Sequence, residues 1–181
     1  MLELATVAPA SWKSYLELCK PNVVAEMLFT AVVGMLLAVP GMPPLDKVVY
    51  GVIGIGLAAA SAAAINHLID QKIDGILNPH RPLPQHYLKS SDVIAFASVF
   101  GVTSMLVLIL KVNMLTAILT FVSLFGYAII YTLWLKRATP QNIVIGGAFG
   151  ATPPLLGWCA ITGQVHPYAL LLVLIIFIWT P

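Results

Sequence analysis

The chain has 181 residues, of which 60% are hydrophobic and only 9% are charged, and its mean hydropathy is +0.95. Soluble domains carry about 25% charged residues, so these values exclude a water-soluble domain and predict an integral protein of the lipid bilayer. The formal net charge of +2 is too small to indicate a nucleic-acid partner.

Apolar stretches recur along the chain, and each complete one is close to the roughly 20 residues that a helix needs to cross the hydrocarbon core. The sequence therefore predicts an all-α fold, a polytopic transmembrane helix bundle with five complete spans and a truncated sixth. The five predicted spans are 21–39, 48–69, 93–110, 115–135 and 142–161, and the sixth begins near Tyr168.

The sixth apolar stretch runs to Trp179, and no basic anchor or polar exit follows it. A helix that ended inside the hydrocarbon would leave carbonyl groups without hydrogen-bond partners. We therefore expect residues 1–181 to be the N-terminal part of a single, longer transmembrane domain. The alternative is a short protein whose last helix lies in the membrane interface.

Lysine and arginine residues are distributed unevenly between the two predicted faces of the membrane. The excess on one face predicts that the N-terminus is cytoplasmic. Cys19 and Cys159 then lie at opposite ends of spans, roughly 30 Å apart, so no disulfide is expected. The residues on the predicted cytoplasmic face are Lys13, Lys20, Lys72, Arg81, Lys89, Lys136 and Arg137, and those on the other face are Lys47 and Lys111.

A candidate metal site lies at the cytoplasmic end of the second span. Asn66, Asp70 and Asp74 are spaced i, i+4 and i+8, so they share one face of a helix. Carboxylates in a membrane span are costly and tend to mark function. Mg²⁺ is typically held by one or two carboxylates together with substrate phosphates, so the spacing predicts a Mg²⁺–diphosphate site. The alternative is a solvated helix end.

Basic side chains are expected near this triad. Pro79, Pro82 and Pro84 exclude helix from the next loop and hold Arg81 near the triad, where its guanidinium could bind phosphate. Lys136 and Arg137 end the fourth span on the same face. Anchoring to the membrane surface is the alternative for all three.

The histidines near the triad are less informative. His67 is beside the triad but about 100° from Asn66 around the helix, and it is no compelling axial ligand for a heme. His80 and His86 could bind phosphate or have no role. Phe121, Phe125, Tyr127, Tyr131 and Trp134 are candidate walls for an isoprenoid chain, with core packing as the alternative.

The triad followed by Arg81-Pro82-Leu83-Pro84 resembles the first signature of the UbiA prenyltransferase superfamily. The stretches from Tyr131 to Gly147 and from Pro153 to Trp158 resemble the protoheme IX farnesyltransferase (heme O synthase) branch. The ending Trp179-Thr180-Pro181 and the opening Lys20-Pro21 also fit that branch, so the resemblance covers nearly the whole chain.

The resemblance implies a helix bundle around a membrane-open cavity, with two Asp-rich signatures that bind diphosphate through Mg²⁺. The triad matches the first signature, and the second should lie beyond residue 181. By the same resemblance, Lys20, Arg81, Lys136 and Arg137 hold the diphosphate. The implied reaction transfers farnesyl from farnesyl diphosphate to a vinyl group of protoheme IX in the bacterial inner membrane. We expect residues 1–181 alone to be inactive.

Three positions depart from the family pattern. Asn22 replaces a basic residue, Glu26 replaces an apolar one, and the loop 75–80 is shorter than usual. A Glu at that depth should be protonated or face the cavity. Rival interpretations are a superfamily member acting on a hydroxybenzoate or quinone precursor, a transporter or structural subunit in which the triad binds a cation, and an inert fragment.

Overall fold

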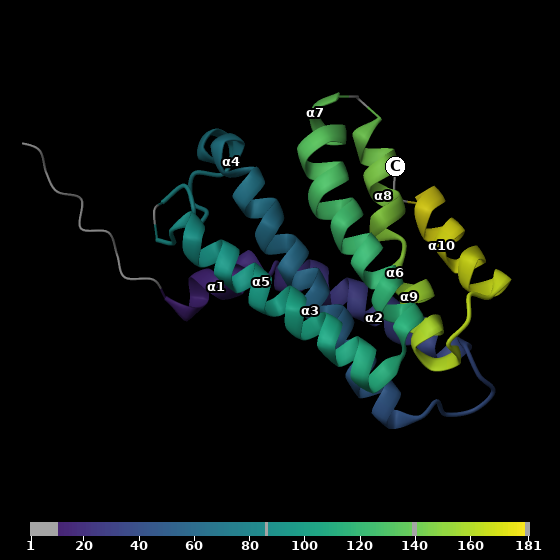
Figure 1. Cartoon of the computed structure of the whole chain (residues 1–181). Coiled ribbons are helices and arrows are strands. Elements are labelled where there is room, and N and C mark those ends of the chain that lie inside the picture. The colour runs from purple at the N-terminus through teal and green to yellow at the C-terminus, as the bar shows by residue number, and fades with distance from the viewer. Residues whose placement is uncertain (1–10, 86, 139–140, 180–181) are drawn as a thin grey trace, which may run out of the picture.

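The computed structural model describes residues 11–85, 87–138 and 141–179, without the side chain of Arg137. Within these ranges all regular structure is helical, which confirms the predicted fold class. The helices are α1 (Trp12–Leu18), α2 (Pro21–Leu37), α3 (Leu45–Ile69), α4 (Gln71–Leu77), α5 (Ser90–Val107), the π-helix η1 (Leu108–Val112), α6 (Met114–Phe125), the π-helix η2 (Gly126–Leu135), α7 (Lys136–Ala138), α8 (Asn142–Gly150), α9 (Pro153–Thr162) and α10 (Pro167–Trp179) (Figure 1).

Four helical segments in the described ranges are long and apolar enough to cross a membrane: 45–69, 90–112, 114–135 and 142–162. The first predicted span is different, because α2 starts at Pro21 and is joined to α1 at an angle of 51°. Counted together, these two helices make a fifth span. The stretch after Tyr168 forms the shorter α10 of 13 residues. The predicted spans therefore agree with helical segments in position, but the first corresponds to α2 alone and reaches the length of a span only together with α1.

The fifth predicted span is not one straight helix. It consists of α8 and α9, which are separated at Ala151 and Thr152. Pro153 and Pro154 begin α9, and a proline has no N–H to donate to the preceding turn, so the hydrogen-bond ladder stops here. Hydropathy predicted the length of the segment correctly and could not show this break.

The alanine-rich α3 is the central helix, and it packs against α2, α5, α6, η2 and α9. Its small side chains let α5 come close enough for hydroxyl groups to reach the neighbouring backbone. Ser61 Oγ donates to the carbonyl oxygen of Ala97 at 2.7 Å, and Ser104 Oγ donates to that of Gly54 at 2.6 Å. These two contacts show how closely α3 and α5 pack.

Helices α2 and α9 make a second close contact, built on two glycines. A Cβ atom on Gly34 would collide with the backbone of Pro154, and one on Gly157 would collide with the carbonyl of Ala31. α9 is therefore fixed against α2, and the two helices close one side of the bundle. Figure 1 shows α4 and α7 at one end of the molecule and the α2–α3 loop at the other.

Cys19 and Cys159 are both free, as predicted. The outward faces of α5, η1, α6 and α10 expose large apolar side chains, as expected for lipid contact. They include Val99, Val102, Leu110, Ile118, Val122, Leu171, Ile175 and Ile178.

Candidate functional site

The triad lies where α3 ends and α4 begins. Asn66, Asp70 and Asp74 are only 4%, 3% and 4% exposed. Asp70 lies between the two helices, but its N–H still bonds to the Asn66 carbonyl, and the Asp74 N–H bonds to the Asp70 carbonyl. Because this i to i+4 path continues, the three side chains stay together, and Asn66 Nδ2 donates to Asp70 Oδ2 at 3.1 Å. The end of the helix is thus buried rather than solvated.

Each triad member is paired with a different basic residue, and all three basic residues were predicted to bind the diphosphate. Lys20 Nζ donates to Asn66 Oδ1 at 2.6 Å, Lys136 Nζ donates to Asp70 Oδ2 at 2.6 Å, and Arg81 Nη1 donates to Asp74 Oδ2 at 2.5 Å. The three cations come from the α1–α2 junction, the start of α7 and the loop after α4. Tertiary folding therefore gathers three positive groups around two carboxylates and one amide.

Lys20 reaches the triad from a strained backbone. Its φ of 48° makes it a left-handed residue, which is uncommon for a side chain other than glycine. Such strain costs about 1–3 kcal/mol and tends to persist at functional sites. The residue lies at the junction between α1 and α2, outside both helices.

The proline-containing loop holds Arg81 as predicted. The Arg81 N–H bonds to the Asn78 carbonyl, and Pro82 and Leu83 are buried under the turn. Asn78 Nδ2 also donates to Asp74 Oδ1 at 3.2 Å, so both oxygens of this carboxylate have partners. In contrast, Asp70 Oδ1 is buried and has no hydrogen-bond partner among the described residues.

The π-helix η2 contributes a residue that sequence reasoning missed. Thr132 is fully buried, and its hydroxyl donates to the Tyr127 carbonyl at 2.9 Å. The same oxygen accepts a hydrogen bond from Asn66 Nδ2 at 3.3 Å. Thr132 therefore orients the Asn66 amide so that its oxygen faces Lys20. A π-helix near polar buried groups is a known sign of a functional segment, but it cannot be read from hydropathy.

His67 lies beside the triad, as its place in the sequence indicated. It is 3% exposed, and its Nδ1 lies 3.9 Å from Asp74 Oδ2. The rotation of about 100° from Asn66 does turn the ring aside. However, Arg81 and α1 lie on that side, so the ring is enclosed with them.

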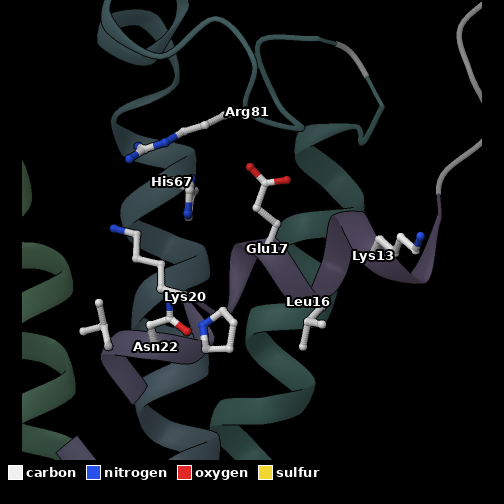
Figure 2. Close-up of a pocket in the computed structure, with 9 residues that line it drawn as sticks. Lys13, Leu16, Glu17, Lys20, Asn22, His67 and Arg81 are labelled. Carbon is white, nitrogen blue, oxygen red and sulfur yellow. The ribbon is translucent and has the colours of Figure 1, made fainter. Parts of the chain in front are cut away.

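Two cavities meet at Lys20. The first, here called the polar pocket, has a volume of about 490 Å³ and includes Glu17, Lys20, His67 and Arg81 in its wall. Figure 2 shows the polar ends of these four side chains around a common space, with Lys13 pointing away from it. Asn22, one of the departures from the family pattern, also lines this pocket.

The second, here called the apolar cavity, has a volume of about 360 Å³ and lies among α2, α3, α6, α8, α9 and α10. Lys20 lines it at one end, and Glu26 lines it too, as expected for a carboxyl group that faces the cavity. Of the five aromatic candidates, Tyr127 lines it and Tyr131 stacks on Tyr127 at 5.4 Å. Phe121, Phe125 and Trp134 are 52%, 46% and 69% exposed and face outward.

Of the three remaining candidate side chains, the structure describes only that of His80. His80 is exposed. His86 and the side chain of Arg137 lie outside the described part of the chain. Among the described residues, no group of three or more His, Cys, Asp and Glu side chains could hold a metal by itself. The donors at the triad are two carboxylates and one amide oxygen, a set that suits Mg²⁺ when a ligand supplies further oxygens.

Comparison with known proteins agrees with this geometry. The sequence profile described as the UbiA prenyltransferase family matches residues 27–181. The chain belongs to the UbiA prenyltransferase family. This confirms the resemblance drawn from the triad and from the stretches around the fourth and fifth spans.

Relatives within this family carry the name of the predicted branch. The chain is 61% identical over 173 residues to the protoheme IX farnesyltransferase of Methylococcus capsulatus and 59% identical over 174 residues to that of Saccharophagus degradans. The matches cover 94% and 95% of the chain, which spans 58% and 57% of the relatives' lengths.

Solved structures share the UbiA fold at low sequence identity. A structure reported for digeranylgeranylglyceryl phosphate synthase matches with a TM-score of 0.81 at 22% identity, covering 91% of this chain and 58% of that chain. A UbiA homologue from Archaeoglobus fulgidus, bound to DMAPP and Mg²⁺, matches with a TM-score of 0.71 at 19% identity, covering 92% and 60%.

Proposed function

We propose that the complete protein transfers a farnesyl group from farnesyl diphosphate to a vinyl group of protoheme IX, giving heme O. It would act in a bacterial cytoplasmic membrane, with its N-terminus and the triad on the cytoplasmic side. The observation that carries the proposal is the pairing of Lys20, Lys136 and Arg81 with the three triad members, together with an apolar cavity that Lys20 also lines. The names of the relatives support the choice of donor and acceptor.

The triad residues fit a Mg²⁺ ion. Asp70 Oδ1 is a buried carboxylate oxygen that has no partner in the described part of the chain, and such an atom is costly unless a cation or donor meets it. Asn66 Oδ1, Asp70 and Asp74 would hold the ion, and the archaeal homologue was solved with DMAPP and Mg²⁺. Once bound, the ion would neutralise negative charge that develops on the leaving diphosphate.

The basic side chains would bind and orient the diphosphate. Without substrate, each cation is held by a triad oxygen, so none is buried unpaired. Diphosphate oxygens would replace these partners. Lys20 lines both cavities, so a substrate with its charged head in the polar pocket and its isoprenoid tail in the apolar cavity would pass this residue.

The chemical role of these side chains would be to stabilise the diphosphate leaving group. When the allylic C–O bond breaks, its electron pair goes to the diphosphate, and Lys20, Lys136 and Arg81 lie where that charge would develop. The apolar walls would keep water from the allylic cation until the acceptor vinyl group attacks it. Water then captures the resulting cation, and the proton from that water is released.

The test uses the complete protein and replaces the carboxylates one at a time. Asp70→Asn and Asp74→Asn should each lower farnesyl transfer about 100-fold or more. Asp46→Asn is a matched control, because Asp46 lies in the first turn of the same helix α3, at the other end, and is exposed. Transfer at the wild-type rate, without Mg²⁺ dependence, in the two triad variants would refute the proposal.

The acceptor needs its own measurement. The complete protein should attach an isoprenoid to protoheme IX and not to a hydroxybenzoate or a quinone precursor, as measured by mass spectrometry of the products. If the isoprenoid were attached only to one of the other acceptors, the proposed diphosphate site would stand and the proposal that heme O is the product would be rejected.

A further inference from the structure

We propose that His67 is a further substrate-binding residue, whose Nε2–H donates a hydrogen bond to an oxygen of the diphosphate. The proposal rests on the proposed function, because it names a contact of the same substrate. It adds a neutral donor to the three cations and the metal-binding triad.

The first observation is that His67 is buried with one ring nitrogen unused. The residue is 3% exposed, and its Nε2 atom has no hydrogen-bond partner among the described residues. Most buried polar side-chain atoms in proteins have a partner, and a lost partner costs about 1–3 kcal/mol. An atom in this state, at the edge of a binding site, is a candidate for a contact with a ligand.

The second observation is the direction in which the ring lies. His67 is part of the wall of the polar pocket together with Lys20 and Arg81, two of the cations assigned to the diphosphate. Figure 2 shows the imidazole between the Arg81 and Lys20 side chains. A diphosphate held by both cations would therefore present an oxygen close to the imidazole.

The third observation concerns the other ring nitrogen. His67 Nδ1 lies 3.9 Å from Asp74 Oδ2, which is too long for a hydrogen bond. The same Asp74 oxygen already accepts from Arg81. Nδ1 is therefore not committed as a donor, and the tautomer with its hydrogen on Nε2 is available to donate. The contact needs no change in the charge of the imidazole.

The experiment measures binding of inorganic diphosphate with Mg²⁺ to the complete protein by calorimetry in detergent micelles. His67→Phe keeps the ring shape and removes the donor, so its affinity should fall about 10- to 100-fold, the range for one hydrogen bond to a charged group. His67→Gln places an amide N–H near the position of Nε2, so its affinity should stay within about threefold of the wild-type value.

His166→Phe is the matched control. His166 stacks on Trp158 with ring centroids 5.3 Å apart, far from the triad in the chain, and phenylalanine preserves the stacking. This variant should bind Mg²⁺–diphosphate like the wild type. The thermal unfolding midpoint of each variant without ligand shows whether that variant is folded. If His67→Phe does not fold, His67→Gln still tests the contact.

The outcomes separate the two proposals. If the wild type binds Mg²⁺–diphosphate and folded His67→Phe binds it equally well, the His67 contact is rejected and the proposed function stands. A His67→Gln variant that is folded and binds 10-fold or more weakly than the wild type also rejects it. If the wild type does not bind Mg²⁺–diphosphate, and Asp70→Asn changes nothing, the proposed function fails and the His67 contact fails with it.

Discussion

Thr132 offers a sharp test of how η2 supports the triad. Its side chain is fully buried and its hydroxyl makes two hydrogen bonds, one to the Tyr127 carbonyl and one from Asn66 Nδ2. Thr132→Val keeps nearly the same shape and removes both. Each bond is worth about 0.6–1.5 kcal/mol in a membrane protein, so the free energy of unfolding should fall by about 1–3 kcal/mol.

Thr116 supplies the control for this substitution. It is also fully buried, but its hydroxyl oxygen has no hydrogen-bond partner among the described residues. Thr116→Val therefore loses no bond and removes an unpaired buried hydroxyl, so its stability should be unchanged or higher. The assay is reversible unfolding in mixed micelles, comparing both variants with the wild type.

A second readout links Thr132 to binding. Without its hydroxyl, the Asn66 amide keeps only Asp70 Oδ2 as an acceptor for its N–H groups, so its oxygen is less firmly aimed at Lys20. Affinity for Mg²⁺–diphosphate should fall about tenfold in Thr132→Val and not in Thr116→Val. Equal losses of stability in the two variants, or unchanged binding in Thr132→Val, would contradict the assigned role.

Two further predictions concern packing and charge. Gly157→Ala should destabilise the protein by about 1–3 kcal/mol in the same unfolding assay, because a Cβ there overlaps the backbone of α2. Its control is Gly75→Ala, whose added Cβ meets no atom within 4 Å and should not lower the free energy of unfolding. Lys136→Met should weaken Mg²⁺–diphosphate binding about 10- to 100-fold in calorimetry, because it removes the cation beside Asp70. Its control is Lys111→Met, at an exposed residue near the ring of Tyr50, which should leave the affinity unchanged. Equal effects of each variant and its control would contradict these assignments.

The triad was predictable because its signal is local. An i, i+4, i+8 spacing puts Asn66, Asp70 and Asp74 on one side of a helix whatever the rest of the chain does, and even the interruption at Asp70 did not separate them. Arg81 was predictable for a similar reason, since a few residues of proline-rich loop join it to Asp74.

Other parts of the site were not predictable from the sequence. A helical wheel gave the angle between His67 and Asn66, but it does not include α1 and the loop with Arg81, which enclose the imidazole. Among the aromatic candidates, apolar composition could not separate Tyr127, which lines the cavity, from Trp134, which is exposed. A membrane protein places apolar side chains both in its interior and on its lipid-facing surface, so hydrophobicity does not distinguish buried from exposed positions.

The sequence by itself determined the class of protein, the approximate positions of the spans and the grouping of the three triad side chains, because hydropathy and helical spacing act over short stretches of chain. Only the tertiary structure decided which cation meets which oxygen. Lys20 and Lys136 reach their partners across 46 and 66 residues of sequence, and Thr132 also lies 66 residues from Asn66. Such pairings follow from how α2, α3 and η2 pack, which depends on small side chains and glycine contacts spread over the whole bundle.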